Sequence, residues 1–364
     1  MTKLLYNLMR KLLFAIAFVC IGCNFPSKIA MNGSGGRGAY NIAIQTTNSE
    51  EMLLNLVRLR YGELLSFLEV SSVITQHSIK NIVTVGIPIP GFNKTNPANL
   101  RGETQWQSQP TIQYTPLQGG DFANQIMQPL NIETIQQIIY SGWDIDRVFL
   151  LAIENFREFP NLHREGLAPK ELKRHKKFHN VINLMTKLQM KGLLQVGIRE
   201  EQKNDSKFRK LQFAVPVDNQ YGKEIANMMK EEKTADGRYI INISEGFDEY
   251  GNIGILPRSL LSCMYSLSKY VMIPEKDIKI CESSDISKHK ISPKIFKELL
   301  IIHNSNRKPK DSYVCVKHRD TWFYIKDGDI HSKKTFLLLL ELYDLQSGRS
   351  KVQGPLLTLP TGTG

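Results

Sequence analysis

Two histidines have the spacing that comes closest to a metal-binding motif. His175 and His179 stand four positions apart, so on a helix they would share one face and both could reach one ion. Arg174, Lys176 and Lys177 crowd the same turn and would repel a cation, and no further ligand completes a set nearby. We therefore expect a solvated basic face here and no metal site.

Other patterns that could carry chemistry have structural explanations. Asp327 and Asp329 flank a glycine, but a calcium loop needs more oxygen ligands than follow them. We expect a turn there, with Asp329 or Ser332 capping the last helix. The motifs H-E-x-x-H, G-x-S-x-G and the P-loop are absent. The sequence therefore predicts no catalytic residues and no cofactor.

The first residues predict export. Lys3, Arg10 and Lys11 precede an uncharged run from Leu12 to Ile21. Such a run covers about 15 Å as a helix, half of a ~30 Å hydrocarbon core, so it suits a signal peptide better than a membrane span.

The sequence around Cys23 resembles a bacterial lipobox. In Cys20-Ile21-Gly22-Cys23, the residue Cys23 would receive the lipid and become the mature N-terminus, although Cys20 stands where leucine is commonest. Simple cleavage and an uncleaved anchor are the alternatives. Asn24 resembles the sorting signal of outer-membrane lipoproteins, so we expect residues 1–22 to be a signal peptide and the protein to face the periplasm.

Composition is that of a folded, basic protein. The 364 residues are 41% hydrophobic and 23% charged, with a net charge of +12. These values exclude a polytopic membrane protein, a coiled coil and a disulfide scaffold. Removing residues 1–22 removes three basic residues and no acidic one, so the mature chain keeps +9. We expect Cys263 and Cys315 to be core residues.

A basic run opens the long helix that we expect over residues 170–191. Its basic members are Lys170, Lys173, Arg174, Lys176 and Lys177. Export removes nucleic acid as a partner, and the run lacks interleaved aromatic residues. Two interpretations remain: a solvated face, or contact with an anionic membrane or glycan surface.

A long hairpin is the most distinctive predicted element. Residues 82–89 and 105–115 have the composition of strands, and Gly91–Gly102 between them is rich in asparagine, proline and glycine. We expect a polar, mobile tip suited to pairing with a neighbouring protein. The candidate partner contacts are Phe92, Asn93, Lys94, Asn96, Asn99 and Arg101.

The remaining pattern predicts an α+β fold of small mixed sheets with packed helices. We expect a tether over residues 23–39, an N-terminal domain over 40–160, a C-terminal domain over 170–347 and an irregular tail over 348–364. A strand over 40–45 and a helix beginning at Asn48 or Ser49 open the first domain. The remaining expected helices cover 121–127, 132–140, 145–156, 221–231, 259–271 and 333–343, and the remaining expected strands cover 193–198, 210–216, 238–244, 313–317 and 322–325.

Charged residues also interrupt the helix that precedes the hairpin. Arg58, Arg60 and Glu63 stand within an otherwise apolar stretch. We expect an arginine–carboxylate pair that holds this helix to a sheet.

Several phrases resemble an uncharacterised family of bacterial lipoproteins of the outer membrane. They are Leu53–Tyr61, Phe67–Ser72, Tyr114–Gly119, Ser141–Trp143 with Asp146-Arg147, Arg258–Leu261, Trp322–Ile330 and Leu357–Pro360. This chain has Lys326-Asp327-Gly328-Asp329 where the family tends to have Asp-Asp-Arg-Asp. The resemblance implies an envelope location and brings no activity.

Three functions are compatible with these observations. The first is a non-enzymatic, lipid-anchored envelope protein that binds other envelope proteins or itself in an outer-membrane assembly, for secretion or transport. The second is an envelope hydrolase acting on glycan or peptide, whose acids and histidines converge only in space. The third is a lipid- or glycan-binding module.

Overall fold

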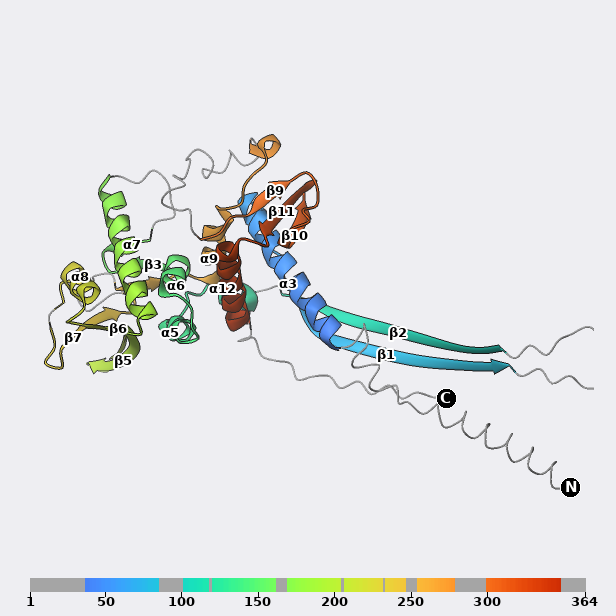
Figure 1. Ribbon diagram of the computed structural model, residues 1–364, viewed down its shortest axis with the longest axis horizontal. Coiled ribbons are helices and arrows are strands. Elements are labelled where there is room, and N and C mark those ends of the chain that lie inside the picture. The colour runs from blue at the N-terminus through green and yellow to red at the C-terminus, as the bar shows by residue number, and fades with distance from the viewer. Residues whose placement is uncertain are drawn as a thin grey trace, which may run out of the picture. The chain divides into compact units, whose positions relative to one another are not determined.

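A computed structural model describes residues 37–84, 101–117, 120–161, 169–203, 206–231, 233–246, 254–278 and 299–347 (Figure 1). By their internal contacts the residues form two compact units. Unit 1 comprises Met1–Asn48 and Leu68–Thr115, and unit 2 comprises Ser49–Phe67 and Pro116–Gly364. The stretch 160–170, where we expected a domain boundary, lies inside unit 2.

Unit 1 contains the predicted hairpin. Strands β1 (Leu68–Thr84) and β2 (Arg101–Pro116) form a two-stranded sheet. The backbone N–H of Leu117 donates to the carbonyl of Phe67 at 3.0 Å, so β1 begins beside the end of β2 and the strands run in opposite directions. β1 begins well before residue 82, because the apolar stretch that follows residue 64 joins the strand.

The expected strand over 40–45 is wrong. Helix α3 runs without a break from Arg37 to Arg60, so it also includes the last residues of the predicted tether. Its first half is mostly exposed, with Ile42 66% exposed, whereas Met52, Leu53 and Leu56 are buried. The isoleucines at 42 and 44 resemble a strand only in isolation, because the helix that buries Leu53 and Leu56 extends back through them.

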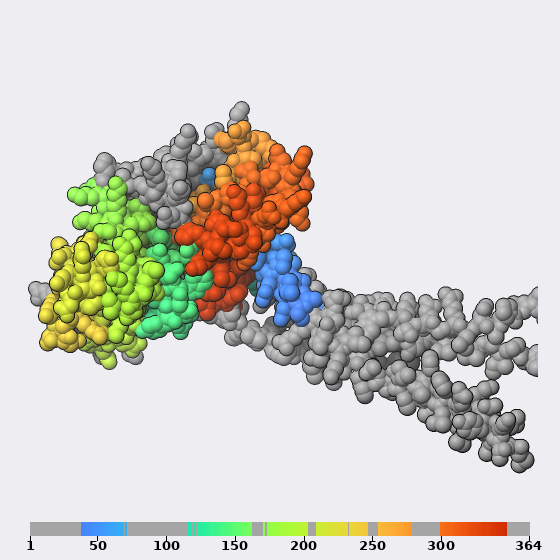
Figure 2. All heavy atoms as spheres, in the orientation of Figure 1, coloured from blue at the N-terminus to red at the C-terminus, as the bar shows by residue number. Residues whose placement is uncertain are grey.

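Unit 2 contains most of the helices. They are α4 (Gly120–Met127), α5 (Ile132–Tyr140), α6 (Ile145–Ala152), α7 (Pro169–Met190), α8 (Gln220–Met229), α9 (Leu260–Ser268) and α12 (Ile330–Ser347), with a short 3₁₀ turn, η1 (Glu275–Asp277). α6 packs against α7 and α9, and α12 packs against α4, α6 and α9. In the space-filling view the atoms of α12, in red, form part of the surface (Figure 2). Within the described ranges, no helix is both long enough and apolar enough to span a bilayer.

Three small antiparallel sheets complete unit 2. The first has the order β4 (Phe159–Pro160), β3 (Ile153–Phe156), β8 (Ile255–Pro257), and the second β5 (Gln195–Lys203), β6 (Ser206–Pro216), β7 (Arg238–Ser244). The third has the order β10 (Ser312–His318), β11 (Thr321–Lys326), β9 (His303–Ser305). The predicted α+β class is confirmed.

Polar side chains start several helices where the sequence indicates a cap. The side chains of Asn131, Asn219 and Ser259 accept hydrogen bonds from Thr134 N (2.8 Å), Tyr221 N (2.9 Å) and Ser262 N (3.1 Å). Asp329 caps α12 as predicted, accepting from Ser332 N at 3.0 Å and from Ser332 Oγ at 2.6 Å. Each cap satisfies backbone donors that the first helical turn leaves free.

The core of unit 2 crosses the stretch where we expected a boundary. Phe149, Phe156 and Phe213 are fully buried and meet edge to face, with ring centroids 5.3–6.0 Å apart. They belong to α6, β3 and β6. Because one aromatic cluster joins elements before and after residues 160–170, these elements share a core.

Candidate functional site

Most of the predicted partner contacts lie outside the residues that the structure describes. This holds for Cys23 and for Phe92, Asn93, Lys94, Asn96 and Asn99. Arg101 is the first residue of β2. Lipidation and the contacts of the tip therefore remain predictions.

Two residues that precede the hairpin, Asn55 and Phe67, are buried within unit 2. Asn55 is fully buried, its Nδ2 donates to Ser66 O at 2.7 Å, and its Oδ1 accepts from Ser66 N at 3.1 Å. The next residue, Phe67, is 2% exposed and stacks on Tyr343 with centroids 5.0 Å apart. The chain thus leaves unit 2 after the buried Phe67 and returns at Leu117, whose N–H donates to the carbonyl of Phe67.

Among the described strands, β1 and β2 pair with each other alone. In the parts of the chain that the structure describes, neither β1 nor β2 pairs with a third strand. A two-stranded hairpin alone is marginally stable in water, and its outer edges carry backbone donors and acceptors that can pair with another strand. The hairpin is therefore our leading candidate for an interaction element.

The predicted basic face of α7 is exposed. Lys170, Lys173, Arg174, Lys176 and Lys177 all lie at the surface, where α7 appears in green (Figure 2). Arg174 Nε also donates to Glu158 O at 2.7 Å, and Lys177 Nζ lies 5.9 Å from the Phe159 ring. The exposure is as predicted, and contact with an anionic surface remains a prediction.

Of the two histidines on this helix, His175 is buried and His179 is half-buried, which corrects our expectation of a solvated face. His175 is fully buried and its Nδ1 lies 3.3 Å from Pro160 O. A carbonyl only accepts, so Nδ1 donates and leaves His175 Nε2 as the acceptor for His179 Nε2, 3.1 Å away. The sequence missed this because the helix turns its 175/179 side toward β4, while the neighbouring lysines point outward.

Burial favours the neutral form of both imidazoles. Desolvation lowers the pKa of His175, although the hydrogen bond to Pro160 acts in the other direction. Desolvation, and then the proximity of His175, lowers the pKa of His179 to about 4. Among the described residues, no group of three or more His, Cys, Asp or Glu side chains could hold a metal ion.

Glu63 forms the expected arginine–carboxylate pair, with an arginine that the sequence did not single out. Arg319 donates to Glu63 Oε1 through Nε (3.0 Å) and through a terminal nitrogen (2.7 Å). Arg319 lies in the β10–β11 turn with φ +44°, far away in the sequence. The pair does hold the end of α3 to a sheet, as expected.

Further ionisable groups converge on this pair. His318 Nε2 lies 3.3 Å from Glu63 Oε2, and Tyr61 donates to Asp277 Oδ2 at 2.7 Å while its ring lies under Arg319. An imidazole beside a carboxylate can serve as a general acid–base pair. Here the guanidinium of Arg319 binds the other carboxylate oxygen of Glu63. The arrangement therefore also has a structural explanation, as a clamp that holds the residues after α3 to the β10–β11 turn.

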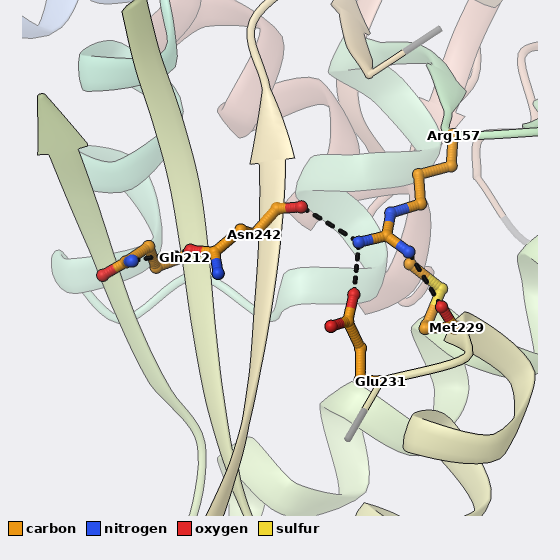
Figure 3. A network of polar contacts seen from close by, with 5 residues as sticks. All are labelled: Arg157, Gln212, Met229, Glu231 and Asn242. Atoms are coloured by element: carbon orange, nitrogen blue, oxygen red, sulfur yellow. Dashed lines mark hydrogen bonds and ion pairs between the residues drawn. The ribbon is translucent and has the colours of Figure 1, made fainter. Parts of the chain in front are cut away.

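A second clamp surrounds Arg157, which has φ +52° in the turn between β3 and β4 (Figure 3). Its guanidinium donates to Met229 O (2.8 Å), to Asn242 O (3.0 Å) and to the carboxylate of Glu231. Gln212 Nε2 donates to Asn242 Oδ1 at 2.6 Å. The network ties this turn to α8 and β7, which explains why an arginine is held in the left-handed region.

Arg258 and Asn161 close the end of α6 from within the core. Arg258 donates to Leu150 O, Leu151 O and Asn161 O at 2.8–3.0 Å, and Asn161 Nδ2 donates to three carbonyls, of Phe149, Leu150 and Ile153. A cation at a helix C-terminus also meets a favourable dipole. Burial lowers the pKa of Arg258 from its ordinary value.

The expected core role of Cys263 is confirmed. Cys263 is fully buried, its Sγ lies 3.4 Å from Leu151 O, and burial raises its pKa to about 12. Cys315 is half-buried in β10. With so high a pKa, the thiol of Cys263 is not a nucleophile.

No family model, curated protein or solved structure matches this chain. The functional argument therefore depends on the residues themselves.

Sequence reasoning missed the clamps around Arg157 and Arg258, and it did not identify Arg319 as the partner of Glu63. Each joins residues that are distant in the sequence, and a lone arginine gives no local signal of its partners. Arg258 carried a weak signal, because it directly precedes the Ser259 cap in a phrase of the resemblance described above.

Proposed function

We propose that this chain is a lipid-anchored component of an outer-membrane assembly, with the hairpin of β1 and β2 as its contact element. The observation that carries the proposal is a sheet of two strands, 17 and 16 residues long, that pair only with each other within the described part of the chain. A folded body rarely keeps such edges unless another chain uses them.

The proposed anchor is Cys23, and the body would face the periplasm. The signal sequence, the lipobox and the resemblance to envelope lipoproteins support this location. The exposed basic residues of α7 add a surface that would favour anionic headgroups, each contributing about 1 kcal/mol near a membrane.

The test replaces residues 68–115 with Asn-Gly. Three residues then connect Phe67 to Leu117, which suffices because these two residues are already hydrogen-bonded. We expect the variant to keep the wild-type melting temperature of unit 2 and to lose all proteins that co-purify with the wild type from its own membranes. Companions that persist on the shortened variant would refute the hairpin as the contact element.

A second experiment tests the anchor. Cys23→Ser should move the protein from the membrane fraction to the soluble fraction after lysis. Ser27→Ala, four residues further on, is the matched control and should stay with the membrane. Retention of the Cys23→Ser protein would refute lipidation at this position.

A hydrolase is the second candidate, favoured by the convergence of Glu63 and His318. Glu63→Gln would abolish hydrolysis of peptidoglycan fragments, whereas Glu341→Gln, which alters another half-buried carboxylate, would not. If the wild-type protein leaves these fragments intact, this candidate is excluded for that substrate.

A further inference from the structure

We propose that the partner of the hairpin is a second copy of this chain, with the outer edge of β1 in one copy paired to the outer edge of β2 in the next. This inference rests on the proposed function and names the partner that the function leaves open.

The first argument concerns backbone hydrogen bonds. Along a strand, alternate residues direct their N–H and C=O groups to opposite sides. In a sheet of only β1 and β2, about half of the backbone groups of each strand lie on an outer edge, and no described strand takes them up. Each edge therefore offers backbone donors and acceptors along much of its length.

The second argument concerns length. With 17 residues, β1 extends over about 55 Å, and β2 nearly matches it with 16. The next longest described strand, β6, has 11 residues and is already paired on both sides. The strand-like part of the irregular tail, Leu356–Leu359, has four residues and is far too short. A second copy supplies a strand of matching length.

The third argument concerns the residues that usually protect an edge. Monomeric proteins guard exposed edges with charged residues, proline or short strands. Between Val70 and Ile79 in β1, and between Gln105 and Tyr114 in β2, there is no Asp, Glu, Lys or Arg. β1 has no proline, and β2 has Pro110 and, as its last residue, Pro116. The central part of β1 therefore has none of these guards, and the central part of β2 has one, Pro110.

Orientation gives the fourth argument. Copies anchored at Cys23 in one membrane would share one orientation, so β1 of one copy would lie beside the oppositely directed β2 of its neighbour. This is the antiparallel arrangement already present within each hairpin. Because the two edges differ, each added copy leaves a free edge, and the assembly stops only when it closes as a ring.

The buried area is adequate for a stable contact. An edge of about 55 Å and a sheet thickness of about 10 Å give roughly 550 Å² for each partner. One contact between two copies therefore buries roughly 1,100 Å² in total, just above the ~1,000 Å² that a specific interface should exceed.

The experiment measures the mass of the purified full-length protein in mild detergent by native mass spectrometry. We expect the wild type to form one closed oligomer. The variant with residues 68–115 replaced by Asn-Gly should have the mass of a single chain. A control with Lys173 and Lys176 changed to serine, on the exposed face of α7, should keep the wild-type mass.

Two proline variants refine the test. In Gln107→Pro and Ser108→Pro, neighbouring residues of β2 lose their N–H, so one change affects the outer edge and the other affects the ladder with β1. We expect at least a tenfold rise in the dissociation constant between copies for both variants. An unchanged constant for both would overturn edge pairing.

The outcomes separate this inference from the proposed function. An oligomer that survives removal of the hairpin overturns self-pairing. A wild-type monomer that captures different companions through the hairpin overturns self-pairing but supports the proposed function. A wild-type monomer that has no companions in its own membranes overturns both.

Discussion

The chain builds two long hairpins and treats them differently. β5 and β6 receive a third strand, β7, and their sheet contributes the fully buried Leu211, Phe213 and Ile241 to the core. β1 and β2 are longer, but no third strand joins them in the described residues. In the first hairpin, β7 pairs with the edge of β6. In the second, no described strand pairs with the outer edge of β1 or of β2.

The largest effect on stability should come from replacing a buried arginine of unit 2, a change that leaves the hairpin of β1 and β2 untouched. Arg258→Ala removes three hydrogen bonds to backbone carbonyls, two of them buried and one half-buried. We expect a loss of about 4 kcal/mol in the free energy of unfolding of unit 2, measured by urea denaturation. Arg258→Lys keeps the charge and should lose less. A loss below about 1 kcal/mol for the alanine variant would contradict this account of the core.

A matched pair of isoleucines compares the two sheets directly. Ile241→Ala in β7 leaves a cavity at a fully buried position, for an expected cost of about 3 kcal/mol to unit 2. Ile112→Ala in β2 should leave the thermal unfolding of unit 2 unchanged, because Ile112 belongs to unit 1. Equal effects on the melting temperature would mean that the hairpin is part of the same cooperative core.

Acid should lower the stability of unit 2 through protonation of His179, which pairs with His175. The pKa of His179 is about 4 in the folded protein and near 6.5 when unfolded, so the unfolded state binds more protons between these values. The stabilisation is complete above pH 6.5 and is lost as the pH falls toward 4. His179→Gln should flatten this part of the curve of melting temperature against pH. An equally steep curve in the variant would show that other groups cause the loss.

The smallest effect is expected at the half-exposed pair of Glu63 and Arg319. Glu63→Gln should cost about 0.5–1 kcal/mol, since solvent screens such pairs. The cost should shrink in 1 M salt, which chemical denaturation with urea at two salt concentrations can measure. A cost above about 3 kcal/mol would mean that the clamp contributes as much as the buried core.

The sequence predicted the regular elements whose signals are local. Helices α4, α5 and α7 and strand β7 lie within a residue or so of their expected bounds, because hydrophobic period and capping residues determine them. The short strands β3, β4, β8 and β9 were missed, and the helix expected to reach residue 156 ends at Ala152. Such strands exist through distant pairing, as between Phe156 and Ile255, which no local pattern reports.

The candidate sites follow the same division. The hairpin and the exposed lysines of α7 were predictable, because strand-like residue patterns and runs of charge are local properties of the sequence. Burial of His175 was not, because it depends on Pro160 of β4, which packs against that side of α7. Likewise, Glu63 was expected to pair, but only the fold brings Arg319 to it.

The hydrogen bond between Phe67 and Leu117 has a consequence for evolution. Because it joins the two points where the chain leaves and re-enters unit 2, whatever lies between them is an insertion into a closed loop. Doubling the length of such an insertion costs only about 0.6 kcal/mol of loop-closure entropy. The hairpin of β1 and β2 can therefore become longer or shorter in evolution at little cost to the stability of unit 2.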